Sequence, residues 1–148
     1  MHIRKAVANE AGTIVDFQVA MARETEDLAL DAATVRRGVE AVFAEPTRGT
    51  YYVAEINGQV AGALLVTYEW SEWRNGTVWW IQSVYVPANY RGQGVYKAMY
   101  NYLKDIVLAD DSLKGIRLYV EKSNHRATAV YNAMGMTDQH YNLFEWLK

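Results

Sequence analysis

The sequence predicts one mixed α/β (α+β) domain, in which a central, mostly antiparallel mixed sheet is flanked by about four helices. Three observations lead to this fold class. The 148 residues are enough for one domain with a proper core. No internal repeat, linker or low-complexity tract divides residues 1–148. Apolar residues recur every second position in some segments and at helical spacing in others, and these segments follow one another in the order β-α-α-β-β-β-α-β-α-β(-β).

The first half of the chain predicts a strand, two helices and a hairpin. Residues 2–7 alternate like a short strand, and residues 11–24 space apolar side chains at helical intervals. Residues 31–46 carry apolar side chains on one helical face, and Pro46 ends the predicted helix. Within residues 49–70, two strand-like runs flank an Asn-Gly dipeptide that suits a type I′ turn.

The second half predicts another antiparallel strand and then a strand between two helices. Residues 77–86 have strand composition and lead into a short loop, after which an apolar helical stripe begins at Val95. Residues 115–121 indicate a further strand. Residues 124–135 indicate a short helix with an asparagine N-cap and a glycine stop. Residues 136–148 are expected to add one or two strands.

Composition and charge argue against several classes of function. The net charge is −2 and no Lys/Arg block stands out, so nucleic-acid binding is not expected. The lack of cysteine excludes disulfides and thiolate metal sites, and the three histidines lack metal-ligand spacing. No apolar run reaches the roughly 18 residues that cross a bilayer, and the N-terminus lacks a signal-peptide core. We therefore expect a cytoplasmic domain with no metal and no membrane partner.

The loop at residues 91–94, Arg-Gly-Gln-Gly, separates a predicted strand from a predicted helix. A helix N-terminus presents unpaired N–H groups and a partial positive charge, and glycines let an anion approach them. The same glycines would also suit a plain tight turn. The sequence of this loop does not match the Walker A pattern of phosphate-binding loops. The dinucleotide fingerprint fails because Lys97 takes the place of its third glycine.

Two segments together resemble the GNAT family of N-acetyltransferases. The loop follows that family's Q/R-x-x-G-x-G/A pattern from Arg91 onward, except that Tyr96 stands where the family has glycine or alanine. About 30 residues later, the chain resembles the family's N-x-x-A-x-x-L/V-Y-x-x-x-G-F/M segment. The matching residues are Asn124, Ala127, Val130, Tyr131, Gly135 and Met136. The order of elements extends the resemblance over nearly the whole chain.

The resemblance implies acetyl transfer from acetyl-CoA to an amine in a ternary complex, without a covalent enzyme intermediate. The pyrophosphate is expected on the N–H groups at the helix start, beside the cation of Arg91. The strand before the loop is expected to hold the pantetheine arm and the thioester carbonyl through main-chain groups. The implied cofactor-binding residues are Val84, Tyr85, Val86, Arg91, Gly92, Gln93, Gly94, Val95, Tyr96, Asn124 and Tyr131.

Tyr131 is the implied proton donor to the leaving thiolate, although a packed aromatic on an amphipathic helix would have the same spacing. Several relatives carry a glutamate or histidine at the places of Trp80 and Gln82, which are not bases here. These two residues are expected to position the substrate or a water. The candidate bases are carboxylates near the expected acceptor site, each of which would also suit a solvated surface. They are Glu24, Glu26, Glu69 and Glu72.

Three functions follow, from different classes. The first is an N-acetyltransferase that acts on a primary amine of a small molecule or a peptide, and a homodimer is compatible with it because dimers are common in the family. The second is a catalytically weak acyl-CoA-binding sensor, which the missing strand carboxylate and Tyr96 favour. The third is a nucleotide-dependent oxidoreductase, which rests only on the poor glycine match. Tryptophans near the acceptor side would form a cation–π pocket or pack on the sheet: Trp70, Trp73, Trp79 and Trp80.

Overall fold

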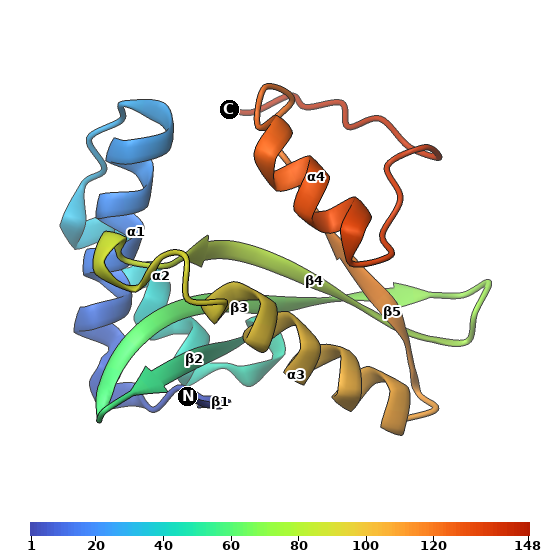
Figure 1. Ribbon diagram of the computed structural model, residues 1–148, viewed down its shortest axis with the longest axis horizontal. Helices are drawn as coiled ribbons and strands as arrows, with labels where there is room; N and C mark the ends of the chain where they lie inside the picture. Colours follow the sequence, from blue (N-terminus) through green and yellow to red (C-terminus); the bar gives the residue numbers. More distant parts are fainter. The chain divides into compact units, whose positions relative to one another are not determined.

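Five strands form one mixed sheet in the computed structural model, which describes residues 1–148. Their order in the sheet follows the chain: β1 (His2–Lys5), β2 (Thr50–Ile56), β3 (Gln59–Ser71), β4 (Gly76–Tyr85) and β5 (Leu113–Leu118). Neighbours from β1 to β4 are antiparallel, whereas β5 runs parallel to β4 (Figure 1). The predicted class, a mixed fold with a mostly antiparallel sheet, is confirmed.

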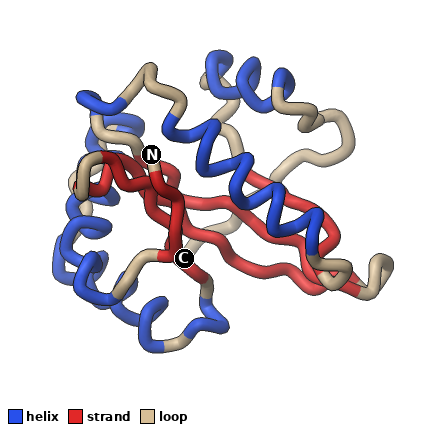
Figure 2. Tube along the Cα trace, turned by 60° about the horizontal axis from the view of Figure 1, so that its bottom comes forward, coloured by secondary structure: helices blue, strands red, loops and turns tan.

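Helices cover both faces of this sheet (Figures 1 and 2). They are α1 (Ala11–Glu26), α2 (Ala32–Ala44) and α3 (Val95–Ala109). On one face, Ile14 of α1 packs in a buried cluster with Tyr51 and Val53 of β2. On the other face, the ring of Tyr102 from α3 lies 6.1 Å from the ring of Tyr52. Neighbouring residues in a strand point to opposite faces of the sheet. Because Tyr51 contacts the α1 side and Tyr52 contacts α3, α1 and α2 lie on one face and α3 lies on the other.

The chain divides into two compact units, Met1–Leu118 and Tyr119–Lys148. The first unit contains the sheet and α1 to α3, and the second contains α4 (His125–Ala133). Short 3-10 turns lie at Ala8–Glu10, Pro46–Arg48 and Ala88–Tyr90. The predicted order of elements is therefore confirmed as far as α4. None of the helices has both the length and the apolar character that a membrane span needs.

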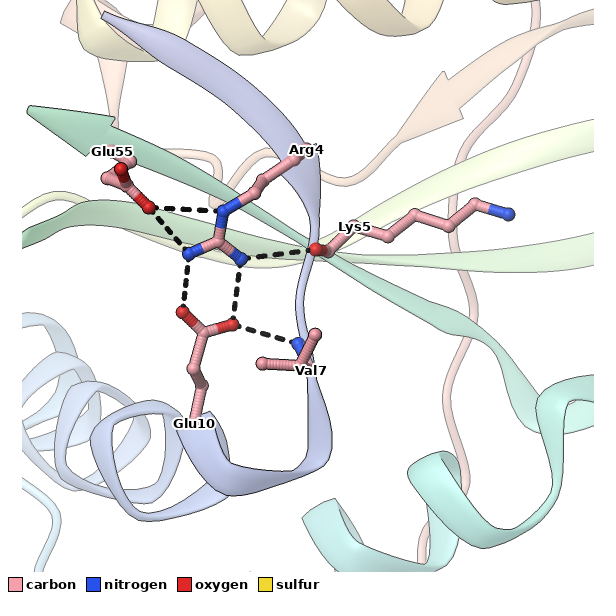
Figure 3. A network of polar contacts seen from close by, with 5 residues as sticks. All are labelled: Arg4, Lys5, Val7, Glu10 and Glu55. Atoms are coloured by element: carbon pink, nitrogen blue, oxygen red, sulfur yellow. Dashed lines mark hydrogen bonds and ion pairs between the residues drawn. The ribbon is translucent and has the colours of Figure 1, made fainter. Parts of the chain in front are cut away.

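One arginine, Arg4 of β1, fixes the start of α1 to the edge of the sheet (Figure 3). Its guanidinium donates to Glu10 at 2.7 and 3.0 Å, and to Glu55 of β2 at 2.7 and 3.1 Å. Glu10 also accepts the Val7 N–H at 2.8 Å, at the turn that precedes α1. The hydrogen bonds from Arg4 lower the pKa of Glu10, and the two carboxylates raise the pKa of Arg4. The network therefore holds a charged carboxylate at neutral pH.

The β2–β3 hairpin turns at Asn57 and Gly58, as the dipeptide predicted. Their φ values are 51° and 75°, and a type I′ turn requires positive φ at both central residues. The turn fixes the register of the hairpin, which pairs Tyr51 with Leu65 and Val53 with Ala63. These four side chains face α1 and α2.

The predicted helix of the second unit forms, but the predicted strands after it do not. The Asn124 side chain accepts the Ala127 N–H at 3.0 Å, which confirms the N-cap, and Gly135 follows the helix with a φ of 86°. The prediction of one or two strands over residues 136–148 is wrong, because these residues form no helix or strand. Forming a strand requires a ladder partner as well as a suitable local sequence.

Candidate active site

Two glycines shape the loop between β4 and α3. Gly92 and Gly94 have φ values of 74° and 75°, in the left-handed region where other L residues are strained. A Cβ atom built on either glycine meets no atom within 4 Å. The glycines are therefore required by the backbone conformation, and the space beside them is open to a ligand.

The loop leads directly into α3, whose N-cap residue is Gly94. The first hydrogen bond of the helix runs from the Ala98 N–H to the Gly94 carbonyl at 3.0 Å, so the preceding N–H groups belong to the open helix end. No side chain caps this end, and the 15-residue helix contributes a partial positive charge there. Backbone donors, bare glycines and positive potential fit a phosphate or pyrophosphate, and hence the predicted CoA loop.

Arg91, the first residue of the loop, is held on three sides. Its Nε donates to the Val86 carbonyl at 2.8 Å, and its Nη2 donates to Glu24 Oε2 at 2.6 Å. Its guanidinium carbon lies 5.6 Å from the centroid of the Tyr85 ring. The Tyr85 hydroxyl donates to the other Glu24 oxygen at 2.8 Å. Glu24 therefore joins the end of α1 to the end of β4 and to the loop.

The contacts of Glu24 make it a poor candidate for a general base. Hydrogen bonds from Arg91 and from Tyr85 lower the pKa of its carboxyl. A carboxylate with a lowered pKa accepts a proton less readily than an ordinary glutamate. Glu26, two residues further on, lies exposed in the last turn of α1 and so keeps a solvated carboxylate.

The end of β4 contains a β-bulge next to the loop. Ala63 of β3 pairs with Tyr85 and Leu65 pairs with Gln82, so β4 has one residue more than β3 over this stretch. Ser83, within the bulge, has a φ of 54°. The buried side chain of Gln18 on α1 donates from Nε2 to the Ser83 carbonyl at 3.4 Å. The bulge takes main-chain groups of β4 out of the regular ladder.

β4 also loses its second neighbour at this point. The parallel ladder between β4 and β5 ends with the pair Ile81 and Leu118. Residues 83–86 therefore have no ladder partner on the β5 side, and Val84 and Val86 are half buried. A strand edge with unpaired main-chain groups is what contact with the pantetheine arm requires. That contact itself stays a prediction.

Gln82 and Trp80 point to the face of the sheet on which α1 and α2 pack. Their partners on β3 are Leu65 and Thr67, and Leu65 packs against the cluster beneath α1 and α2. The Gln82 amide Nε2 donates to the Thr67 hydroxyl at 2.6 Å. The two residues expected to contact the substrate thus share one face.

Glu69, another candidate base, lies on the same face as Thr67 because it is two residues further along β3. Its carboxylate forms an ion pair with Arg117 of β5, with Nη1 and Oε2 2.5 Å apart. β4 lies between these two strands, so the ion pair spans it. Glu69 is therefore a carboxylate on the same face as Gln82 that already carries a cationic partner, while Glu72 lies exposed in the turn after β3.

The tryptophans of the β3–β4 hairpin do not gather into one pocket. Trp79 is buried on the α3 face, where its ring lies 6.3 Å from that of Tyr52. Trp80 follows it in the strand and so points to the opposite face. Trp70 and Trp73 are 63% and 87% exposed. Trp79 therefore packs on the sheet, which was the alternative expectation. The prediction of a pocket formed by all four tryptophans is wrong.

Tyr131 and Asn124 belong to the second unit, Tyr131 within α4 and Asn124 at its start. Asn124 caps the helix, which was one of its two expected roles. Tyr131 is half buried. Its role as proton donor and the contact of Asn124 with CoA stay predictions.

The sequence did not single out Gln18, Thr67 or Arg117. Gln18 had a local signal, since it lies four residues from Ile14 and from Ala22 on the buried stripe of α1. A polar side chain on a buried helical face needs a partner, which here is the carbonyl of Ser83. Thr67 and Arg117 had no such signal, because their partners lie on other strands.

Comparisons with known proteins agree with this geometry. The family model described as "Acetyltransferase (GNAT) family" matches residues 17–136. A crystal structure of "a possible acetyltransferase" from Clostridium difficile 630 is 39% identical with a TM-score of 0.93, and the match covers 99% of this chain and 97% of that one. The comparison with curated proteins found no match.

Two solved structures of lower identity share the fold. One is a "predicted acetyltransferase with acetyl-CoA" from Clostridium acetobutylicum, with a TM-score of 0.74 and 19% identity, covering 99% of this chain and 94% of that one. The other is a ribosomal-protein-alanine N-acetyltransferase from Brucella melitensis biovar Abortus 2308, with a TM-score of 0.80 and 13% identity, covering 99% of both chains.

Proposed function

The chain belongs to the GNAT family of acetyltransferases, and from this premise we propose that it transfers an acetyl group from acetyl-CoA to a primary amine of a small molecule or a peptide. The observation that carries the proposal is the loop at residues 91–94. Two glycines with left-handed φ leave open space at the uncapped start of α3, directly after the bulged end of β4. The match to residues 17–136 spans both compact units, which supports treating residues 1–148 as one acetyltransferase domain.

When bound, acetyl-CoA supplies an acetyl group activated as a thioester. N–H groups of residues 93–96 hold its pyrophosphate, because they face an open helix end with a partial positive charge. Main-chain groups of Val84 and Val86 hold the pantetheine arm and the thioester carbonyl. The bulge at Ser83 and the end of the β5 ladder at Ile81 support this assignment, because both leave those groups outside the sheet pairing.

The chain also has to move two protons while a C–N bond forms and a C–S bond breaks. Tyr131 gives its hydroxyl proton to the leaving sulfur. Gln82 and Trp80 position the amine, and its proton passes through water to Glu69 or to the solvated Glu26. Glu24 is the least suitable acceptor, because Arg91 and Tyr85 lower its pKa.

A catalytically weak acyl-CoA sensor is the second candidate function. Two observations favour it. Gln82 stands where several relatives have a base, and both Glu24 and Glu69 are paired with arginines. A protein with this site would bind acetyl-CoA and release CoA slowly whatever amine is offered.

A thiol-release assay over a panel of amines separates the two functions. We expect at least one primary amine, among polyamines, amino acids and peptides with free N-termini, to accelerate CoA release from acetyl-CoA. Mass spectrometry should then find the product heavier by one acetyl group. Acetyl-CoA binding without acceleration by any amine would favour the sensor. A homodimer and a cytoplasmic location stay predictions, and light scattering in solution tests the first.

A further inference from the structure

Arg91 is the one cation of the loop, yet its guanidinium is already engaged within the first unit. Nε and Nη2 donate to the Val86 carbonyl and to Glu24 at 2.8 and 2.6 Å. One face of the group lies on the Tyr85 ring. A side chain held by two hydrogen bonds and an aromatic ring is fixed in one rotamer, although about half of it is exposed.

The charge of Arg91 is also compensated. The Glu24 carboxylate is 2.6 Å from Nη2, so the pair has no net charge when viewed from a phosphate group. A phosphate placed on Arg91 would also approach the Glu24 carboxylate and be repelled by it. The backbone N–H groups at the start of α3 carry no such penalty, since no side chain caps them.

The Glu24–Arg91 pair connects three segments that are distant in the sequence. Glu24 lies in the last turn of α1, Tyr85 ends β4, and Arg91 begins the loop, 67 residues after Glu24. A loop with two glycines has a high conformational entropy, and ordering it on binding costs affinity. Anchoring its first residue reduces that cost before the ligand arrives.

We propose that Arg91 is a positioning residue, locked by Glu24 and Tyr85 in the conformation that presents the backbone of residues 92–96 to the pyrophosphate of CoA. Arg91 does not itself supply the charge that binds the phosphates, and Glu24 serves the cofactor loop instead of acting as the base. The inference rests on the proposed function, because it concerns the same CoA site.

Calorimetric titration with CoA tests the proposal on the full chain and three variants: Glu24→Gln, Arg91→Gln and the double variant. We expect each single change to weaken CoA binding by about three- to tenfold. The double variant should bind no more weakly than the weaker single one, because either change breaks the same unit. If Arg91 bound the phosphates directly, Glu24→Gln would remove a repulsive carboxylate and strengthen binding. Unchanged or tighter binding in Glu24→Gln therefore overturns the proposal.

Steady-state kinetics distinguish a positioning role of Glu24 from a role as general base. In Glu24→Gln, the KM for acetyl-CoA should rise by a similar factor while kcat at saturation stays within about twofold. The KM for acetyl-pantetheine, which lacks the pyrophosphate, should not change. A drop in kcat with an unchanged KM would mean that Glu24 acts on the amine, and would overturn the proposal.

Asp16→Asn is the matched control, because Asp16 is an exposed carboxylate on the same helix. It removes the same charge from α1 and should leave CoA affinity unchanged. Tyr85→Phe removes one of the two hydrogen bonds to Glu24 and should weaken binding by a smaller factor than Glu24→Gln. If the unaltered chain binds no CoA, the proposed function itself fails. If it binds CoA and Glu24→Gln binds equally well, only this inference fails.

Discussion

Gln82 on β4 and Thr67 on β3 are joined by a hydrogen bond of 2.6 Å, from the amide of Gln82 to the hydroxyl of Thr67. The bond fixes a neutral amide on the face where α1 and α2 pack, one residue before the bulge of β4. Several GNAT relatives have a base at this place. Gln82 is therefore a position where a substitution is informative.

Replacing Gln82 by glutamate should supply the missing base. The Gln82→Glu carboxylate can accept the Thr67 hydroxyl and also take a proton from the amine, since a positioned general base contributes about 100-fold or more in favourable cases. We expect kcat at neutral pH to rise by about tenfold, with no change in CoA affinity. Steady-state kinetics with the best amine of the panel measure this. An unchanged or lower kcat would contradict the idea that a base is missing at this position.

The left-handed glycine at the start of α3 should be intolerant of substitution. Gly94→Val places a branched side chain at a φ of 75°, which costs about 1–2 kcal/mol of unfolding free energy, and the side chain occupies the space beside the loop. We expect acetyl-CoA affinity to fall by about tenfold or more. Gly38→Ala in the exposed middle of α2 is the control, and should gain about 0.5–1 kcal/mol. A folded Gly94→Val variant with full affinity would remove the loop from the cofactor site.

Removing the Tyr131 hydroxyl should slow chemistry without loosening the cofactor. Tyr131→Phe is expected to lower kcat by about 10- to 100-fold, because the leaving thiolate then lacks its proton donor. Acetyl-CoA affinity should change by less than about twofold. Tyr102→Phe on α3, whose ring packs against Tyr52, is the matched control. Equal turnover of Tyr131→Phe and the unaltered chain across the pH range would leave Tyr131 as a packing residue.

The Arg4–Glu10–Glu55 network should make stability depend on pH. The folded pKa of Glu10 lies below the ordinary value of 4.5. Its contribution is therefore present at neutral pH and is lost as the pH falls from that value through the folded pKa. Glu10→Gln should lower the unfolding free energy at pH 7 by about 1–2 kcal/mol, and the difference should shrink below pH 4.5. Urea unfolding at several pH values measures this, with Asp16→Asn expected to follow the unaltered chain. A difference that stays constant with pH would contradict the assignment.

Features encoded by neighbouring residues were predictable from the sequence. The Asn57–Gly58 turn depends on local φ preferences and has positive φ as expected, and the two loop glycines, which were expected to leave the backbone bare or to make a tight turn, also have positive φ. The apolar stripe that begins at Val95 likewise predicted α3, because the spacing of its residues lies within a single continuous segment.

Features that join distant segments were not predictable. Nothing near Glu24 marks Arg91 as its partner 67 residues later, so Glu24 looked like a free carboxylate. The bulge at Ser83 depends on the register of β3 against β4, which no single strand encodes. Residues 136–148 were expected to add one or two strands, but strand formation depends on a partner that the local sequence does not specify.

Isothermal titration with acetyl-CoA and, separately, with NAD tests directly whether residues 91–96 form a site for CoA. We predict measurable heat with acetyl-CoA, saturation at one ligand per chain, and loss of most of that affinity in Gly94→Val. NAD should give no heat. Heat with NAD and none with acetyl-CoA would contradict a CoA site at residues 91–96.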